Sequence, residues 1–176
     1  MRILKWLISL VVILAAVFFG GAFLLPKDIT VARSIEIDAP VSDVFPHVNS
    51  LKATQNWSPW LERDPNVQLT YEGPEEGVGA KMAWASDEPS VGQGTQEITI
   101  SEPGKQVVTA LDFGPMGTAT ATFTLEGAED KTTLTWDLYT DAGNNPMARW
   151  MGLVMDGMVG ADYETGLANL KTLVEG

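Results

Sequence analysis

The chain has 176 residues, a formal net charge of −12, 45% hydrophobic residues and no cysteine. Without cysteine, disulfides, thiol catalysis and thiolate metal sites are all excluded. All 23 acidic residues follow residue 26, where only nine Lys and Arg accompany them, and this excess of negative charge excludes direct nucleic-acid binding.

The first feature in chain order is an apolar run from Trp6 to Leu25 that contains no charged residue. As an α-helix it is roughly 30 Å long, about the thickness of the hydrocarbon core of a bilayer. We therefore expect residues 1–26 to form a single transmembrane anchor. Arg2 and Lys5 precede the run, so the positive-inside rule predicts a cytoplasmic N-terminus and a domain on the periplasmic or extracytoplasmic side.

A cleaved signal peptide is the alternative, because Gly20-Gly21-Ala22 offers small residues at a cleavage site. The apolar run continues through Phe23-Leu24-Leu25, which favours the anchor. Both interpretations place the rest of the chain outside the cytoplasm. A short linker over 27–30 then holds a single domain, residues 31–176, close to the bilayer surface.

The domain is expected to begin with a strand at 31–37, followed by short helices at 41–48 and 50–54. Pro46 should kink or end the first of these helices. Alternating apolar residues between turn signals predict six further strands, at 67–72, 80–85, 94–101, 106–113, 118–126 and 132–140. Asn145 and Pro146 then provide a cap and a first-turn proline for a helix that runs to Val174.

Two of the strands have clearly distinct faces. In 118–125, four threonines alternate with Ala119, Ala121, Phe123 and Leu125, and in 133–138 polar residues alternate with Leu134, Trp136 and Leu138. This pattern indicates a sheet that is solvated on one face and covered on the other. Neither covered face carries a charged residue, which argues against an enzyme pocket on it.

The C-terminal helix has two apolar faces that do not coincide. One comprises Met147, Trp150, Met151, Val154, Met155 and Met158; the other comprises Val159, Tyr163, Leu167, Leu170 and Val174. The change falls near Gly157 and Gly160, which predicts a kink or a change of packing partner there. The second half should close the core, and the first half should cover the sheet, form a lid over a cavity or contact a membrane or partner.

Several motifs occur together and in a fixed order. They are Asn56-Trp57-Ser58-Pro59-Trp60, Asp64-Pro65, Gly77-Val78-Gly79-Ala80 leading to Trp84, Gly92-Gln93-Gly94, and the closing 162–171 segment DYETGLANLK. With the order of elements, this set resembles the polyketide cyclase/dehydrase-like branch of the SRPBCC superfamily, over residues 30–175. The resemblance implies an α+β, START-like helix-grip fold of order β-αα-β6-α. In that fold a seven-stranded curved antiparallel sheet surrounds the C-terminal helix and leaves an apolar cavity.

Members of this superfamily bind lipids, sterols, quinones or polyketides, and some catalyse cyclisation. The residues expected to line the cavity here are aromatic, methionine or small side chains on the covered faces, in the loop after the short helices, and on the last helix. They are Trp57, Trp60, Met82, Trp84, Phe113, Ala119, Ala121, Phe123, Trp136, Trp150, Met151, Met155 and Met158. Each of them equally suits ordinary core packing.

His47 is the only histidine and therefore the only nameable catalytic base, but the sequence places no orienting carboxylate beside it. We expect no metal site, since one histidine and no cysteine leave only the acidic turn at 72–76. No phosphate loop or dinucleotide fingerprint is present, so no cofactor is expected.

The leading hypothesis is a membrane-anchored binding module without catalysis, whose cavity takes a lipid, a quinone or a similar hydrophobic molecule. The first alternative is an accessory subunit of a membrane protein complex that docks through the anchor and the C-terminal helix. The second is a polyketide cyclase- or aromatase-like enzyme. The sequence does not name the ligand, the partner or the oligomeric state.

Overall fold

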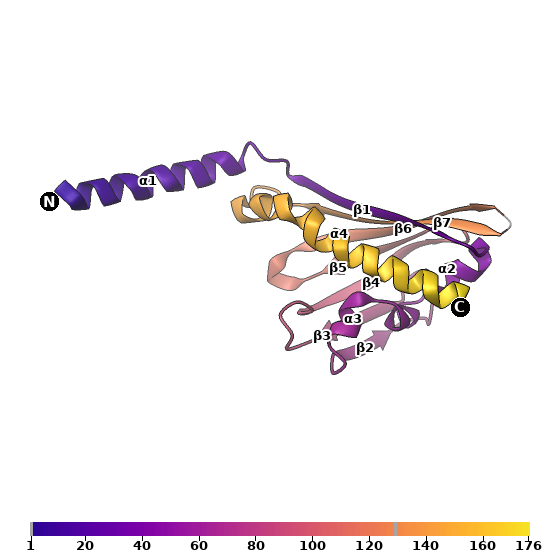
Figure 1. The fold of residues 1–176 in the computed structure, drawn as a ribbon. Coiled ribbons are helices and arrows are strands. Elements are labelled where there is room, and N and C mark those ends of the chain that lie inside the picture. The colour runs from indigo at the N-terminus through magenta and orange to yellow at the C-terminus, as the bar shows by residue number, and fades with distance from the viewer. Residues whose placement is uncertain (1, 129) are drawn as a thin grey trace.

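In the computed structural model, which describes residues 2–128 and 130–176, seven antiparallel strands form one sheet in the order β1-β7-β6-β5-β4-β3-β2 (Figure 1). The fold is α+β, as the sequence predicts. The strands are β1 (Asp28–Ile37), β2 (Gln68–Glu72), β3 (Lys81–Ala85), β4 (Gln93–Glu102), β5 (Gln106–Asp112), β6 (Thr118–Ala128) and β7 (Lys131–Asp141).

From β2 to β7 each strand pairs with the next one in the chain, whereas β1 pairs with β7 at the far edge, with Asp28 opposite Asp141 and Ile37 opposite Thr132. All seven predicted strands are present, and β1 begins at Asp28, three residues before the predicted strand. The predicted turn at 127–130 contains residue 129, which lies outside the described residues.

The helical elements are α1 (Arg2–Ala22), α2 (Val41–Asn49), the 3₁₀ turn η1 (Ala53–Asn56), α3 (Pro59–Arg63), the 3₁₀ turn η2 (Gly114–Met116) and α4 (Pro146–Glu175). The short helix expected at 50–54 is instead the 3₁₀ turn η1, and two further details differ from expectation. First, α2 continues through Pro46 to Asn49, because the carbonyl that loses its partner belongs to exposed Ser42 and is free to bond water. Second, Pro59 begins the short helix α3 within a segment predicted as a loop.

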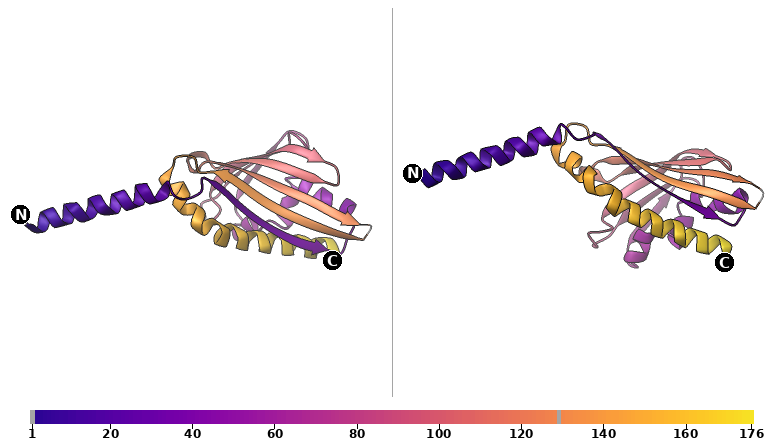
Figure 2. Two further views of the ribbon diagram at one scale, coloured as in Figure 1. Left: turned by 90° about the horizontal axis from the view of Figure 1, so that it is seen from above. Right: turned by 45° about the horizontal axis from the view of Figure 1, so that its top comes forward.

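One face of the sheet is packed against α4 and the other is open to solvent (Figures 1 and 2). On β6, Ala121, Phe123 and Leu125 are buried, and the alternating threonines lie on the opposite, partly exposed face, which confirms the predicted faces. The core lies between the sheet, α2 and the second half of α4, which buries Tyr163 and Leu167.

Helix α4 is continuous over 30 residues, and its packing partners change along its length. Gly152 faces Ile29 of β1 and Gly160 faces Arg33, whereas Gly166 lies against Pro59 and Trp136. Helix α4 begins beside the end of α1 and then runs along the sheet (Figure 2). The expected change of packing partner is therefore present, within a helix that is not interrupted.

Helix α1 extends away from the domain, at the end where α4 begins and β1 starts (Figure 2). Within the part of the chain that the structure describes, it is the one helix long and apolar enough to cross a membrane, which suits an anchor or a signal sequence. It ends at Ala22, three residues before the end of the apolar run, and Phe23 to Lys27 connect it to β1.

Candidate functional site

An apolar cavity of about 310 Å³ lies between the inner face of the sheet, α3 and the middle of α4. Strands β3 to β7 form its floor and the segment from Val48 to Leu61 forms one wall. Its lining side chains are Val48, Leu51, Thr54, Trp57, Ser58, Trp60, Leu61, Met82, Trp84, Pro89, Ser90, Val91, Gln96, Thr109, Leu111, Phe113, Met116, Ala121, Phe123, Trp136, Leu138, Val159 and Tyr163, with Gly92 contributing backbone. Its volume lies at the lower end of the range for small-molecule sites.

An aromatic cluster forms one side of this cavity, with Trp136 at its centre. The Trp136 ring stacks on Tyr163 of α4 with ring centroids 3.8 Å apart, and Phe123 lies 4.9 Å away on the neighbouring strand. Trp57 and Trp60 approach Trp136 edge-to-face, at 5.4 and 5.7 Å. The cluster joins the sheet, α4 and the Trp57–Trp60 segment, so it fixes the shape of the cavity wall.

The indole N–H groups of the cavity tryptophans differ in how they are satisfied. Trp57 donates to the His47 carbonyl at 3.1 Å, and Trp84 donates to the Val91 carbonyl at 3.2 Å. The Trp136 N–H is buried and has no hydrogen-bond partner among the described residues. Buried polar groups usually have a partner, so this N–H is the least satisfied donor of the cavity wall.

The floor of the cavity carries a second polar feature, a side-chain hydrogen bond between two neighbouring strands. Gln96 of β4 donates from Nε2 to Thr109 Oγ1 of β5 at 3.0 Å. Thr109 is fully buried and Gln96 is half-buried on the same face as Ile98. These two side chains add hydrogen-bonding capacity to an otherwise apolar surface.

The cavity lining contains no Asp, Glu, Lys, Arg or His among the described residues. Its only titratable side chain is Tyr163, and burial raises the pKa of that phenol well above its usual range. Tyr163 therefore stays protonated at neutral pH and does not act as a base there. The described residues also contain no group of three or more His, Cys, Asp or Glu placed to hold a metal ion.

Eight of the thirteen residues expected to line the cavity are brought together by the fold. They are Trp57, Trp60, Met82, Trp84, Phe113, Ala121, Phe123 and Trp136. Whether they contact a ligand remains a prediction.

The other five lie outside the cavity. Ala119 is on the inner face of β6, one alternate position closer to the start of the strand, and Met155 packs against the edge of the core. Met151 and Met158 point to the surface, and Trp150 packs against α1. His47 is also absent from the lining, and its backbone carbonyl holds the Trp57 indole.

Sequence reasoning missed Gln96, Thr109 and Tyr163 as cavity residues. Gln96 is two positions before buried Ile98 in β4, so strand alternation places both on the covered face. The Pro89–Gly92 loop carries no such signal, because a loop has no periodicity.

The strand register determines where the cavity opens. Asp28 pairs with Asp141, Thr118 with Asp112, and Ala85 with Gln93, so the turns at 86–92 and 113–117 lie at the end of the sheet where α1 is attached. Met116, Pro89 and Ser90 are the most exposed lining residues, and all three belong to these turns. The mouth of the cavity therefore faces the same end of the domain as α1.

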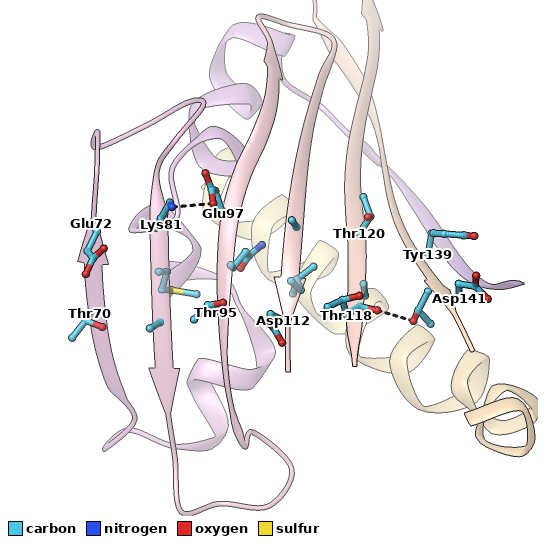
Figure 3. Close-up of a pocket in the computed structure, with 17 residues that line it drawn as sticks. Thr70, Glu72, Lys81, Thr95, Glu97, Asp112, Thr118, Thr120, Tyr139 and Asp141 are labelled. Atoms are coloured by element: carbon cyan, nitrogen blue, oxygen red, sulfur yellow. Dashed lines mark hydrogen bonds and ion pairs between the residues drawn. The ribbon is translucent and has the colours of Figure 1, made fainter. Parts of the chain in front are cut away.

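A second hollow, of about 620 Å³, lies on the opposite face of the sheet (Figure 3). Figure 3 shows threonines, acidic side chains and Lys81 on this face, where Lys81 forms an ion pair with Glu97 at 3.1 Å. The hollow follows the curvature of the sheet, and one face of the sheet is its only wall. It is larger than the inner cavity, but it lacks the enclosing aromatic and helical elements that a small-molecule site needs.

Residues 28–175 match the family model described as polyketide cyclase/dehydrase and lipid transport. A comparison with curated proteins found no match.

Among solved structures, a protein from Thermobifida fusca matches with a TM-score of 0.63 and 18% identity, covering 81% of this chain and 90% of that one. The Aha1 dimer from Colwellia psychrerythraea matches at 0.56 and 18%, covering 84% and 96%. CalU16 from Micromonospora echinospora matches at 0.55 and 15%, covering 84% and 74%. At these identities the likenesses concern the fold.

Proposed function

This chain belongs to the polyketide cyclase/dehydrase and lipid transport family, and we propose that it binds an apolar small molecule at a membrane without transforming it. The observation that carries the proposal is the inner cavity, which is walled by aromatic rings and lined by no charged or histidine side chain. Acid-base catalysis needs a positioned group that exchanges protons near neutral pH, and the buried Tyr163 phenol does not.

The volume and the polar groups of the cavity define the class of ligand. About 310 Å³ suits a ring system or one acyl chain better than a complete two-chain phospholipid. The Trp136 N–H and the Gln96 amide would orient a carbonyl or hydroxyl group of such a molecule. A quinone or an oxygenated lipid has this combination of an apolar body and a few acceptor atoms.

The membrane location rests on α1. In our proposal α1 and the apolar residues after it are an uncleaved anchor with a cytoplasmic N-terminus, and the domain that begins with β1 at Asp28 is exported and binds the ligand. The connection from Ala22 to Asp28 is short, which keeps the domain at the bilayer surface. Trp150 also bonds to Phe18 of α1, and Arg149 to Ala22 at the end of that helix, and cleavage after Ala22 would remove both contacts.

The experiment is native mass spectrometry of the full chain purified in mild detergent, with the Ala121→Trp variant beside it. Ala121 lies on the cavity floor, so a tryptophan there fills the cavity. Ala110→Trp is the matched control, because Ala110 lies on the opposite face of the neighbouring strand. We expect a stoichiometric small-molecule adduct on the parent chain and on Ala110→Trp, and no adduct on Ala121→Trp.

An adduct that survives Ala121→Trp and disappears in Ala110→Trp would move the site to the outer hollow. A parent chain without any adduct, which also fails to bind added ubiquinone or fatty acid, would overturn the proposal. Circular dichroism of both variants shows whether a lost adduct reflects a lost fold.

A second candidate function is that of an accessory subunit in a membrane protein complex. The observation behind it is a row of exposed apolar side chains on the first half of α4, close to α1. Gentle solubilisation followed by sizing would reveal a stable larger assembly if this function holds, and a lone monomer would argue against it.

A further inference from the structure

The first half of α4 presents an apolar stripe to the surface, which we define as Met147, Met151, Val154 and Met158. The four side chains recur every three or four residues and are between 45 and 61% exposed. Helices of soluble domains normally turn such a stripe toward the core. A contiguous exposed stripe of this kind marks an interaction surface.

Two side chains at the start of α4 hold this stripe next to the end of α1. Trp150 donates its indole N–H to the Phe18 carbonyl at 3.1 Å and stacks on the Phe18 ring, with centroids 6.2 Å apart. Arg149 donates to the carbonyls of Ala22, Phe23 and Leu25 at 3.3–3.4 Å. These carbonyls lie at and just after the C-terminus of α1, where backbone acceptors lack helical partners.

The same guanidinium is anchored on the domain side, because Arg149 also donates to the Gly143 carbonyl at 2.7 Å from Nη2 and 2.9 Å from Nε. Arg149 therefore bridges α1 and the turn that precedes α4. The stripe begins two residues away from this bridge, so its position relative to α1 is set by a defined joint and not by a loose linker.

The charge of this region differs from that of the rest of the domain. Residues 146–159 contain one basic residue, Arg149, and one acidic residue, Asp156. Asp156 is neutralised by Arg33, at 2.9 Å. In a strongly acidic domain, this neutral, methionine-rich surface suits contact with the uncharged interface of a zwitterionic bilayer, and its flexible side chains need no shaped partner.

The mouth of the cavity lies at the same end of the domain. Met116, which is 77% exposed, and Val159 of α4 both belong to its lining. Val159 directly follows Met158 and lines the cavity, so the end of the stripe lies close to the cavity. An orientation of the domain that brings the stripe to the bilayer therefore also brings the mouth of the cavity to the bilayer.

We propose that the apolar stripe of α4, with Phe23, Leu24 and Met116, inserts into the interface of the bilayer that α1 spans, so that the cavity opens directly onto the lipid. The proposal rests on the proposed function in one respect, namely that α1 is a transmembrane anchor. The ligand then passes between bilayer and cavity without crossing water. The domain docks on the membrane through its own surface and is not merely tethered above it.

The chain contains no cysteine, so a single introduced cysteine can be labelled specifically. A single cysteine introduced by Met151→Cys, within the stripe, carries the fluorophore NBD, and the full chain is reconstituted in phosphatidylcholine vesicles with or without 5-doxyl-phosphatidylcholine, which quenches probes near the interface. Leu173→Cys is the matched control, since Leu173 is an apolar residue of α4 with nearly the same exposure as Met151, 41% against 45%, but lies near the opposite end of the helix. We expect the doxyl lipid to quench the Met151 probe at least twofold and to leave the Leu173 probe unchanged.

Equal quenching at the two positions, or none at either, would overturn the proposal. A Met151 probe with blue-shifted emission but no lipid quenching would also overturn it, because a protein partner or a second copy then covers the stripe. Vesicle flotation reports separately whether α1 anchors the chain. The mass-spectrometric adduct reports ligand binding, so docking can fail while the proposed function stands.

Discussion

The indole of Trp136 and the phenol of Tyr163 lie almost parallel, with ring centroids 3.8 Å apart and planes inclined by 9°. This pair is closer than most aromatic pairs, whose centroids are about 4.5–7 Å apart. It joins the centre of β7 to the middle of α4 at the wall of the cavity. The close approach depends on Gly166, where a Cβ would lie 3.0 Å from both Trp136 Cζ3 and Pro59 Cδ.

Gly157 and Gly160 should respond in opposite directions to alanine, although they lie three residues apart in α4. A Cβ at Gly157 meets nothing within 4 Å, so Gly157→Ala should raise the free energy of unfolding by about 0.8–1 kcal/mol through helix propensity. A Cβ at Gly160 would lie 2.1 Å from Arg33 Nη2 and displace the guanidinium from Asp156 and Glu164. Urea midpoints should therefore rise for Gly157→Ala and fall for Gly160→Ala; a rise in both would show that Arg33 holds no fixed position.

Gly94→Ala should distort the cavity wall near its mouth. A Cβ at Gly94 would lie 2.5 Å from the Trp84 ring and 2.6 Å from the Asp112 carbonyl oxygen, and the carbonyl belongs to the backbone and has little freedom to move. We expect a loss of about 1–3 kcal/mol in unfolding free energy, as for other overpacked sites, together with weaker ubiquinone binding. Thr95→Ala, on the opposite face of the same strand, is the control and should leave binding unchanged. Unaltered stability of Gly94→Ala would contradict the packing.

Alkaline pH should destabilise the domain through Tyr163. Burial raises the pKa of this phenol in the folded state, so above about pH 10 the unfolded chain releases a proton that the folded chain retains. The unfolded state then binds fewer protons, and stability falls as pH rises, by at most about 1.4 kcal/mol per pH unit. Tyr163→Phe keeps the ring and removes this proton, so its urea midpoint should fall less steeply between pH 9.5 and 11. Parallel profiles for the two proteins would refute a buried, protonated phenol.

Arg149→Gln should loosen the joint between α1 and the domain without unfolding the domain. The variant loses the donors that reach Ala22, Phe23 and Leu25, and the domain core does not contain Arg149. In detergent micelles, proteinase K should cut the 23–27 segment at least several-fold faster, while the urea midpoint stays unchanged. Arg63→Gln is the control, because it breaks an ion pair between Arg63 of α3 and Asp162 of α4. Proteinase K should cut this variant at the rate of the parent chain. A parent rate for Arg149→Gln would show that the bridge does not restrain this segment.

The order of elements could be predicted because apolar alternation and turn residues both point to the same strands. The inner positions of Ala121, Phe123 and Trp136 follow directly from that alternation. The start of α3 could not be predicted, because Trp57 to Trp60 shows no helical periodicity. Pro59 is the first residue of this five-residue helix, but proline is equally common in loops, so it does not indicate a helix by itself.

The position of Trp150 could not be derived from periodicity at all. Its angle on the helix groups it with Met151 and Met155, and this predicts a common covered face. In the structure it turns to Phe18, which precedes it by 132 residues. A contact between two helices that are far apart in the chain does not alter the apolar periodicity of either helix, so the sequence of neither helix indicates it.

The pairing of β1 with β7 has a consequence for how the protein is made. Helix α1 and then β1 leave the ribosome first, but the partner strand of β1 follows only about a hundred residues later, and α4 is last of all. Until then β1 has no partner strand on either edge, and the chain is held by α1 at its beginning. Closure of the sheet and docking of α4 therefore come at the end of synthesis, so a truncated chain that lacks β7 and α4 should fail to fold and should be exposed to proteolysis.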